Sequence, residues 1–455
     1  MSPPPKQFTS PARLELNAVA RLATPVVTVQ LGMMVMGTVD TMMLGRYSAT
    51  ALAAGGLGHA AYFGIFVFFM GLLFGLDPLV AQAVGAGDDA RVARHLQVGL
   101  GVAVLATIPL SLLMWDVRWA LRLLNQHPSI IEPTAQYLRG LVPGNMGFLV
   151  FVALRQGLQA MSMVRQAVWA VVISNVVNVV ANWLLIFGHL GFPELGIRGS
   201  AYASSISRWV MAVVILAAGW NVLRPYLTNV RHAVLRPAAY GDLLRIGVPV
   251  GFMTSVESWL FVAVALMMGS LGAREIAAHQ ISINLAALAF MVPLGIAGAA
   301  TTRVGNAIGA RDPEGARRSA AVCLFLGASV MTVSAAAFAT FPGVLARLYT
   351  PDERVVAVAM VLLPIAALFQ VVDGLQVVAA GVLRGAADTR VPAILAVCGY
   401  WGLGLPLGWW LGLRLEWGPR GLWWGLTVGL ASVAVLLLLR IRRRFAGDLA
   451  AYETS

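Results

Sequence analysis

Twelve long apolar segments run through the chain and restrict the folds that it can adopt. A helix needs about 20 mostly apolar residues to cross the hydrocarbon core of a bilayer. The segments that meet this requirement lie at 18–42, 52–80, 96–115, 134–157, 166–188, 199–222, 243–270, 276–305, 316–342, 356–383, 391–413 and 420–440. The loops between them are too short for a soluble domain, and the strand alternation of an outer-membrane barrel is absent. The sequence therefore predicts an all-α membrane protein with twelve transmembrane helices.

The composition agrees with a surface that faces lipid. Only 11% of the 455 residues are charged, whereas a soluble domain carries about 25%. The formal net charge is +12, but the basic residues lie between the apolar segments and form no patch with interleaved aromatic residues, which argues against a nucleic-acid partner. Cys323 and Cys398 lie inside apolar segments without any CxxC or Cys/His spacing, so we interpret them as packing residues.

Basic residues also indicate the orientation, because Lys and Arg in short loops stay on the cytoplasmic side of a membrane. If the N-terminus is cytoplasmic, most of the 32 Lys and Arg residues fall in cytoplasmic segments or at the adjoining helix ends. Met1–Ser10 lacks the parts of a removable signal peptide, so we expect the first apolar segment to be a spanning helix. Both termini are predicted to be cytoplasmic.

The second half of the chain repeats the first. A shift of 224 residues aligns Arg21–Val26 with Arg245–Val250. The same shift pairs Gly45 with Gly269, Gly71 with Gly295, Gly85–Ala86 with Gly309–Ala310, and Asp88 with Asp312. Each half holds six segments, so both halves enter the membrane from the same side and are related by an axis along the membrane normal. We predict two pseudo-symmetric six-helix lobes, at 1–222 and 243–455, joined by a cytoplasmic loop at 223–242.

Four carboxylates fall inside the apolar segments: Asp40, Asp77, Glu257 and Asp373. Each costs about 2.5–3.5 kcal/mol at the centre of a bilayer, so each should face protein or a wet cavity. Basic residues at their depth are nearly absent, which argues against simple ion pairs. A carboxyl group in a low dielectric takes up a proton or requires a metal cation, and a cationic organic substrate seeks the same charge. We interpret Asp40, Glu257 and Asp373 as cation-coupling acids; structural hydrogen bonds to neighbouring helices are the alternative.

Two groups of polar residues accompany these acids. Asn175, Asn178 and Asn182 share one helix face because they are spaced i, i+3, i+7. Their amides can ligate a cation or donate to Asp40, and contacts that hold helices together are the alternative role. The second group lies in the eighth segment: His279, Gln280 and Asn284. We interpret His279 as structural, and Gln280 and Asn284 as polar residues of a substrate or cation cavity.

Asp77 differs from the other acids because it precedes Pro78 near the predicted cytoplasmic end of its helix. The repeat places Arg303 at a similar depth in the other half of the chain. We hypothesise that Asp77 and Arg303 approach each other across the lobe boundary and help to close a cytoplasmic gate.

Three motifs resemble those of the multidrug and toxic compound extrusion (MATE) family, and of its NorM-like bacterial branch in particular. They are Val39–Asp40–Thr41 with Leu44–Gly45, Ala277–Gln280, and the run Asp373–Gly385. The likeness extends over nearly the whole chain. It implies a V-shaped pair of six-helix lobes in the bacterial inner membrane. Such lobes alternate between inward and outward states and expel cationic, amphipathic compounds in exchange for Na⁺ or H⁺.

The resemblance also implies roles for single residues. By position, Asp40 is similar to the acid of the N-terminal cavity, with Asn178 and Asn182 as its polar companions. Glu257 and Asp373 are similar to the cation-binding acids of the C-terminal lobe, and they are the metal ligands if the coupling ion is Na⁺.

Phe369 is a departure from the family pattern. It stands one helical turn before Asp373, where NorM-like proteins can have a tyrosine. Phenylalanine keeps the ring face for a cation–π contact but lacks the hydroxyl. The choice between Na⁺ and H⁺ therefore stays open.

These observations together predict a secondary active multidrug exporter that works by antiport and needs no cofactor besides its coupling ion. We expect a monomer whose partners are small cationic or amphipathic organic substrates and membrane lipid. A lipid-linked oligosaccharide flippase of related fold is the alternative, but it would favour a wider and more basic cavity. An enzyme is not expected, because the six histidines are scattered and have no HExxH or GxSxG context.

Overall fold

A computed structural model describes residues 11–123, 126–228, 237–447, 449 and 451–452. The segment Met1–Ser10, and the basic residues Arg231 and Arg236 of the predicted loop at 223–242, lie outside the described residues.

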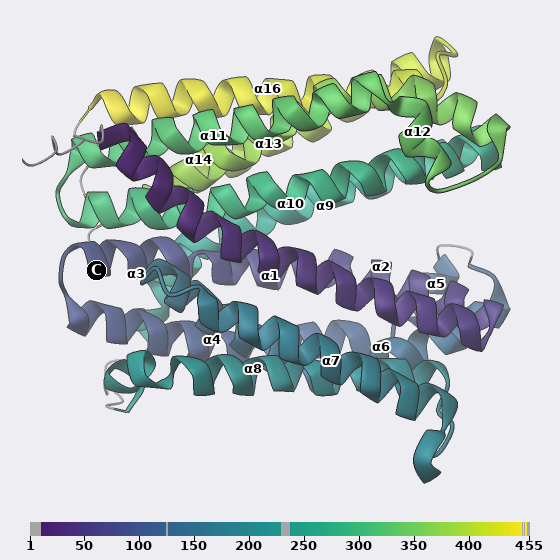
Figure 1. Cartoon of the computed structure of the whole chain (residues 1–455), viewed down its shortest axis with the longest axis horizontal. Coiled ribbons are helices and arrows are strands. Elements are labelled where there is room, and N and C mark those ends of the chain that lie inside the picture. The colour runs from purple at the N-terminus through teal and green to yellow at the C-terminus, as the bar shows by residue number, and fades with distance from the viewer. Residues whose placement is uncertain (1–10, 124–125, 229–236, 448, 450, 453–455) are drawn as a thin grey trace, which may run out of the picture.

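The prediction of an all-α membrane protein is confirmed. Twelve helical segments of the described chain are long and apolar enough to cross a membrane, and they run along the long axis of the molecule (Figure 1). Seven elements make up the first six spans: α1 (Pro11–Tyr47), α2 (Ala49–Phe74) with α3 (Leu76–Gly85), α4 (Asp89–Trp115), α6 (Pro128–Ala160), α7 (Arg165–Phe187) and α8 (Ile197–Leu227). The short α5 (Arg118–Leu123) and η1 (His189–Gly191) lie in the connections.

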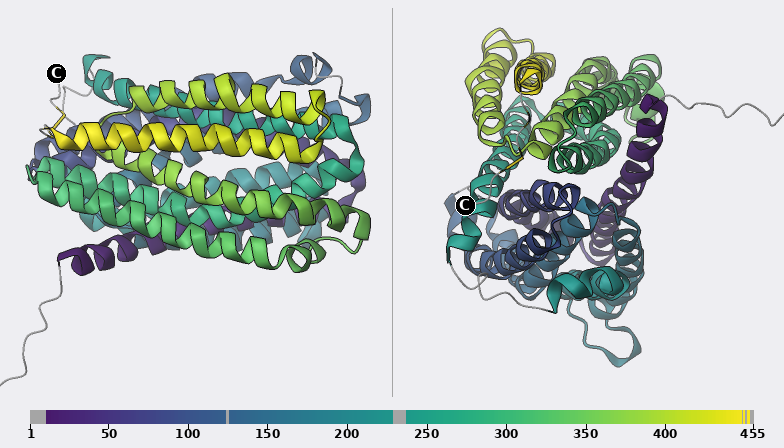
Figure 2. Two further views of the ribbon diagram at one scale, coloured as in Figure 1. Left: turned by 90° about the horizontal axis from the view of Figure 1, so that it is seen from above. Right: turned by 90° about the vertical axis from the view of Figure 1, so that its left-hand side faces the viewer.

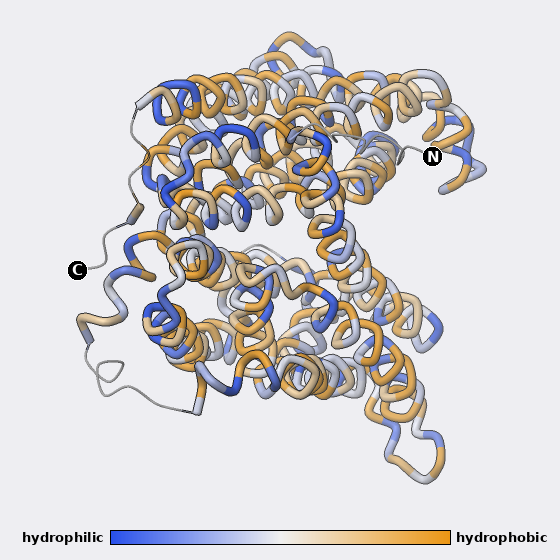
Figure 3. The backbone as a smooth tube through the Cα atoms, turned by 60° about the vertical axis from the view of Figure 1, so that its left-hand side comes forward, coloured by the Kyte–Doolittle hydropathy of each residue, from blue (hydrophilic) through white to orange (hydrophobic). Residues whose placement is uncertain are grey.

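The second half follows the same plan. Its spans are η3 (Pro237–Tyr240) with α9 (Gly241–Leu271), α10 (Ala273–Gly309), α11 (Pro313–Thr340), α13 (Glu353–Gly385), α14 (Arg390–Val397) with its continuation, and α16 (Pro419–Ala446). The continuation consists of the π-helix η4 (Cys398–Gly404), α15 (Leu405–Trp409) and the π-helix η5 (Trp410–Arg414). The short α12 (Pro342–Arg347) precedes α13. Apolar residues predominate along these helices (Figure 3).

Two helices that correspond in the sequence repeat begin with the same type of cap. The side chain of Asp88 accepts a hydrogen bond from the amide of Arg91 (2.9 Å), and the side chain of Asp312 accepts one from the amide of Gly315 (2.8 Å). These carboxylates cap the starts of α4 and α11, whose first amides have no partner within the helix. The same local chemistry thus starts the corresponding helix of each half.

The helices form two lobes, each with its own apolar core, and the first helix of each lobe crosses to the other (Figure 2). One core is built mainly from α2–α8 and the other from α10–α16. Val19, Leu22 and Val26 of α1 join the second core together with Ala23, and the corresponding residues of α9 join the first: Leu243, Ile246 and Val250. Because the 224-residue shift relates these positions in α1 and α9, the two helices cross between the lobes in a pseudo-symmetric way.

The two lobes touch at the end of the bundle where α1 begins and α16 ends (Figure 1). A Cβ on Gly85 of α3 would lie 2.0 Å from the carbonyl oxygen of Asn306, and one on Gly309 of α10 would lie 2.0 Å from that of Gln82. Small residues four apart let helix backbones approach closely in membranes. The pattern here is Ala81 with Gly85 and Gly305 with Gly309. The crossing of α3 and α10 therefore closes this end of the molecule.

Candidate cation-binding sites

Asp40 is the centre of a polar site inside the N-terminal lobe. It lies seven residues before the end of α1 and is only 8% exposed. Its Oδ1 accepts hydrogen bonds from the amide nitrogens of Asn178 (3.0 Å) and Asn182 (2.6 Å) on α7. Its Oδ2 accepts a hydrogen bond from the hydroxyl of Ser204 on α8 (2.6 Å). The carboxylate is thus held by three neutral donors from two other helices.

The predicted asparagine face of α7 is divided between two tasks. Asn178 and Asn182 are one turn apart, so both amides reach the same carboxylate. Asn175 instead donates to the carbonyl oxygens of Gly32 (3.0 Å) and Val171 (2.8 Å), and so holds α7 against α1. Ser204 was missed because it lies in a run of small residues, where a serine has no pattern that distinguishes it from packing.

Arg208 corrects the expectation that basic residues are nearly absent at the depth of the acids. It lies on α8, one turn from Ser204, and its guanidinium stands over the rings of Tyr62 (4.3 Å to the centroid) and Phe148 (5.2 Å). Its charge acts on Asp40, but no ion pair joins the two in the described chain. Aromatic faces stabilise a desolvated cation, so Arg208 is held by rings while Asp40 is held by amides.

The C-terminal lobe brings together Glu257 of α9 and Asp373 of α13. Asp373 is 5% exposed and Glu257 is half-buried, and the charge of Glu257 acts on Asp373. The Oδ1 atom of Asp373 is buried and has no hydrogen-bond partner among the described residues. Two carboxylates whose charges interact in a low dielectric repel each other unless a proton or a cation neutralises one of them. The pair can therefore bind a positive charge.

An aromatic cluster borders these acids. The ring of Phe369 packs edge to face against Phe261 (6.2 Å between centroids) and Trp423 (5.5 Å). The ring of His279 contacts Trp423 in the same way (5.7 Å). Phe369 is therefore a packed member of the wall next to Asp373. His279 is buried, in agreement with its interpretation as a structural residue, although its Nδ1 has no partner in the described part of the chain.

Gln280 and Asn284 are not brought to the acids by any described hydrogen bond. Gln280 is exposed and Asn284 is half-buried on α10. Their assignment to a cavity remains a prediction.

The predicted pair of Asp77 and Arg303 is wrong in this structure. Asp77 is fully buried and accepts hydrogen bonds from Gln159 (2.6 Å) and from Thr302 (3.0 Å). Arg303 pairs instead with Glu15 of α1 (2.5 Å). One residue along a helix turns a side chain by about 100°, so Thr302 points to α3 whereas Arg303 points to α1. Glu15 was missed because it precedes the first apolar segment.

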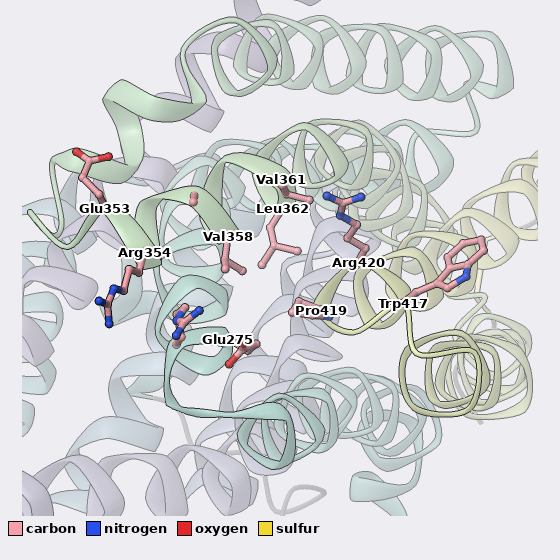
Figure 4. Close-up of a pocket in the computed structure, with 11 residues that line it drawn as sticks. Glu275, Glu353, Arg354, Val358, Val361, Leu362, Trp417, Pro419 and Arg420 are labelled. Atoms are coloured by element: carbon pink, nitrogen blue, oxygen red, sulfur yellow. The ribbon is translucent and has the colours of Figure 1, made fainter.

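Other parts of the described chain offer no stronger site. They contain no cluster of three or more His, Cys, Asp or Glu side chains that could hold a metal ion. A cavity of about 580 Å³ lies at the starts of α10, α13 and α16, with Glu275, Arg354 and Arg420 in its wall (Figure 4). A second cavity, of about 930 Å³, lies between Ala20–Pro25 of α1 and residues 162–166, where α7 begins. Neither is lined by the acids described above.

Comparisons with known proteins agree with this architecture. The chain is 39% identical over 452 residues to "Multidrug resistance protein NorM" of Burkholderia vietnamiensis. The matched region covers 97% of this chain and 97% of that protein. It is 36% identical to "Multidrug resistance protein PmpM" of Pseudomonas aeruginosa, over 95% of this chain and 92% of that protein.

Solved structures show the same fold. The eukaryotic MATE transporter AtDTX14 superposes with a TM-score of 0.87 at 24% identity, over 95% of this chain and 96% of that one. The Vibrio cholerae MATE transporter VcmN in its bent form gives a TM-score of 0.86 at 18% identity, over 98% of this chain and all of that one (100%). The MatE family model matches residues 25–184 and again residues 249–410, once in each half of the chain. The protein belongs to the MatE family.

Proposed function

We propose that the protein is a secondary active multidrug exporter, which expels cationic, amphipathic organic compounds in exchange for Na⁺ or H⁺. One observation carries the proposal. Asp40, Glu257 and Asp373 lie inside the helical lobes, and none of them forms an ion pair in the described chain. Neutral donors hold Asp40, so its negative charge remains available to a mobile cation. Acids inside a membrane are characteristic of ion and substrate pathways.

Antiport follows from competition for this charge. A bound Na⁺ or H⁺ neutralises a carboxylate, and an organic cation that occupies the same lobe then loses its electrostatic attraction. If the ion binds from one side of the membrane and the substrate from the other, the two can exchange only when the lobes change orientation. The names of the relatives, which describe multidrug resistance proteins, support organic compounds as the substrates.

The closed contact between α3 and α10 supports alternating access. It lies at the end of the bundle where α1 begins and α16 ends. The distribution of basic residues assigns this end of the bundle to the cytoplasm. Thr302 donates to Asp77 across this contact, and Gln82 donates to the carbonyl oxygen of Gly385 (3.0 Å). We infer that the structure is closed on the cytoplasmic side. Opening that side separates the lobes at 1–222 and 243–455, which the segment at 223–242 joins, in a protein that acts as a monomer.

Transport into proteoliposomes tests the proposal. A fluorescent organic cation is supplied on one side, and a Na⁺ gradient and a pH gradient are imposed in separate experiments. We expect accumulation of the compound against its own gradient with at least one of the two driving ions. Liposomes that lack the protein provide the background. Absence of accumulation under both gradients, with the protein folded and correctly inserted, would overturn the proposed function.

A further inference from the structure

A carboxylate and two arginines come together at the closed contact between the lobes. Asp77 of α3 is completely buried, Arg155 of α6 is buried, and Arg384 of α13 is half-buried. Both guanidinium groups stand over the ring of Phe74, at 5.9 Å (Arg155) and 5.5 Å (Arg384) from its centroid. The charges of both arginines act on Asp77, and that of Arg384 acts more strongly. The acid of one lobe therefore interacts with an arginine of the other lobe as well as with one of its own.

The ends of α6 and α13, which carry these arginines, are equivalent in the sequence repeat. Ser162 and Ala387 follow the two helices with positive φ angles of 63° and 55°, and a shift of 225 residues relates them. The amide of Ser162 donates to the carbonyl oxygen of Gln159 (2.7 Å), and the amide of Ala387 donates to that of Arg384 (2.8 Å). Gln159 and Arg384 therefore occupy the same position, one in each half of the chain.

These two equivalent side chains also make equivalent hydrogen bonds. Nε2 of Gln159 donates to Oδ2 of Asp77 (2.6 Å), and Nε of Arg384 donates to Oγ1 of Thr301 (3.1 Å). Asp77 and Thr301 are themselves related by the 224-residue shift. Each half thus contains the same donor and acceptor positions. The first half has an acid with a neutral donor, whereas the second half has a base with a neutral acceptor.

This division of charge directs the electrostatic attraction across the contact between the lobes. An acid and a base at the two positions of one half would pair within that lobe, and the separation of the lobes would not affect them. Here Asp77 and Arg384 belong to different lobes and meet beside the crossing of α3 and α10, where Thr302 also donates to Asp77 (3.0 Å). Opposite charges attract strongly in a low dielectric and weakly in water. The attraction is therefore strong only while the lobes touch.

We propose that the attraction between Asp77 of the first lobe and Arg384 of the second lobe keeps this end of the molecule closed. Arg155 lies in the same lobe as Asp77, so its interaction with the acid does not depend on closure. Without the charge of Asp77, Arg155 and Arg384 would be two positive charges that repel each other across the contact. The inference rests on the lobe movement of the proposed function, but its test requires no transport.

Distances between spin labels test the inference in the purified full-length protein. Labels on Ala90→Cys and Glu314→Cys report the separation of α4 in one lobe from α11 in the other, after replacement of the exposed native Cys398. Asp77→Asn retains the size of the side chain and removes its charge. We expect it to lower the ratio of closed to open molecules by about tenfold or more, because removal of one partner leaves buried charges without compensation.

The sharpest comparison adds Arg384→Gln, which gives the second half the residue that the first half has as Gln159. In the double variant Asp77→Asn with Arg384→Gln, no second positive charge remains to repel Arg155, so the closed population should recover toward that of the wild type. Arg384→Gln alone should favour the open state, since it removes the attraction between the lobes. Thr302→Val is the matched control: it removes a neutral donor to the same carboxylate, also from the other lobe, and should shift the ratio less than Asp77→Asn does.

An unaltered distance distribution in Asp77→Asn would overturn the inference. A double variant at least as open as Asp77→Asn would do the same, because a role limited to packing or hydrogen bonding predicts that the second substitution adds to the effect of the first. If Asp77→Asn does not fold, Arg384→Gln alone decides, and a wild-type distribution in it would contradict the inference. Export of an organic cation by wild-type proteoliposomes tests the proposed function separately, so the failure of one is distinguishable from the failure of the other.

Discussion

A single methyl group at the crossing of α3 and α10 should open the closed end of the molecule. In Gly309→Ala the new Cβ would lie 2.0 Å from the carbonyl oxygen of Gln82, whereas ordinary contacts of a Cβ begin at 3.4 Å. The carbonyl oxygen belongs to the backbone and the new Cβ is bonded directly to it, so no side-chain rotation can relieve the clash. The two helices must therefore move apart. Overpacking of this kind costs about 1–3 kcal/mol. Because the cost applies only when the lobes touch, it should lower the ratio of closed to open molecules by about 5-fold to 150-fold.

Distances between spin labels can measure this shift. Labels on Ala90→Cys and Glu314→Cys lie in the exposed first turns of α4 and α11, in a protein whose exposed native cysteine Cys398 has been replaced. Gly309→Ala should increase the population with long distances. The same change at Gly56, where a Cβ would meet nothing within 4 Å, should leave the distribution as in the wild type.

Because the two lobes are pseudo-symmetric, the same experiment can be repeated at the equivalent glycine of α3. Gly85→Ala places a Cβ at the same 2.0 Å from the carbonyl oxygen of Asn306, so it should have an effect of similar size. An unaltered distance distribution in both Gly309→Ala and Gly85→Ala would refute the conclusion that this crossing holds the lobes together.

Two further predictions concern the hydrogen bonds near the acids. Ser204→Ala removes one of three donors to Asp40, so the ion concentration that half-saturates export should change by about fivefold to tenfold, while Ser207→Ala, whose hydroxyl bonds to its own helix, should behave like the wild type. Exchange of the charges of Glu15 and Arg303 in a double variant should restore export lost in the single variants, since the two form an ion pair. Exchange of Arg303 with Asp77 should not restore it.

Hydrophobic length and internal repetition made the architecture predictable from the sequence. A membrane leaves the backbone few alternatives to the helix, so apolar segments translate directly into spans. The match between Arg21–Val26 and Arg245–Val250 likewise predicted corresponding helices. It did not reveal that α1 and α9 each begin against the other lobe, because a repeat defines equivalence between segments and not the partner on which they pack.

The site was predicted only as far as charge and helical spacing allowed. Asp40 with Asn178 and Asn182 could be anticipated, since a buried charge and a row of amides are visible in the sequence. The choice of Arg303 over Thr302 as the partner of Asp77 failed because a shift of one residue changes the direction of a side chain around the helix. Arg208 was not found, because its place in the site depends on aromatic rings that distant helices bring to it.

Counter-transport by a substrate gradient alone tests the central claim most directly. Proteoliposomes are loaded with an organic cation, with no Na⁺ or pH gradient imposed, and movement of the coupling ion is recorded as the substrate leaves. The wild type should move the ion in the opposite direction, and Asp40→Asn, Glu257→Gln and Asp373→Asn should each abolish or uncouple this movement. Substrate efflux without any opposing ion movement, or full exchange in all three variants, would contradict the account that these acids carry the exchanged cations.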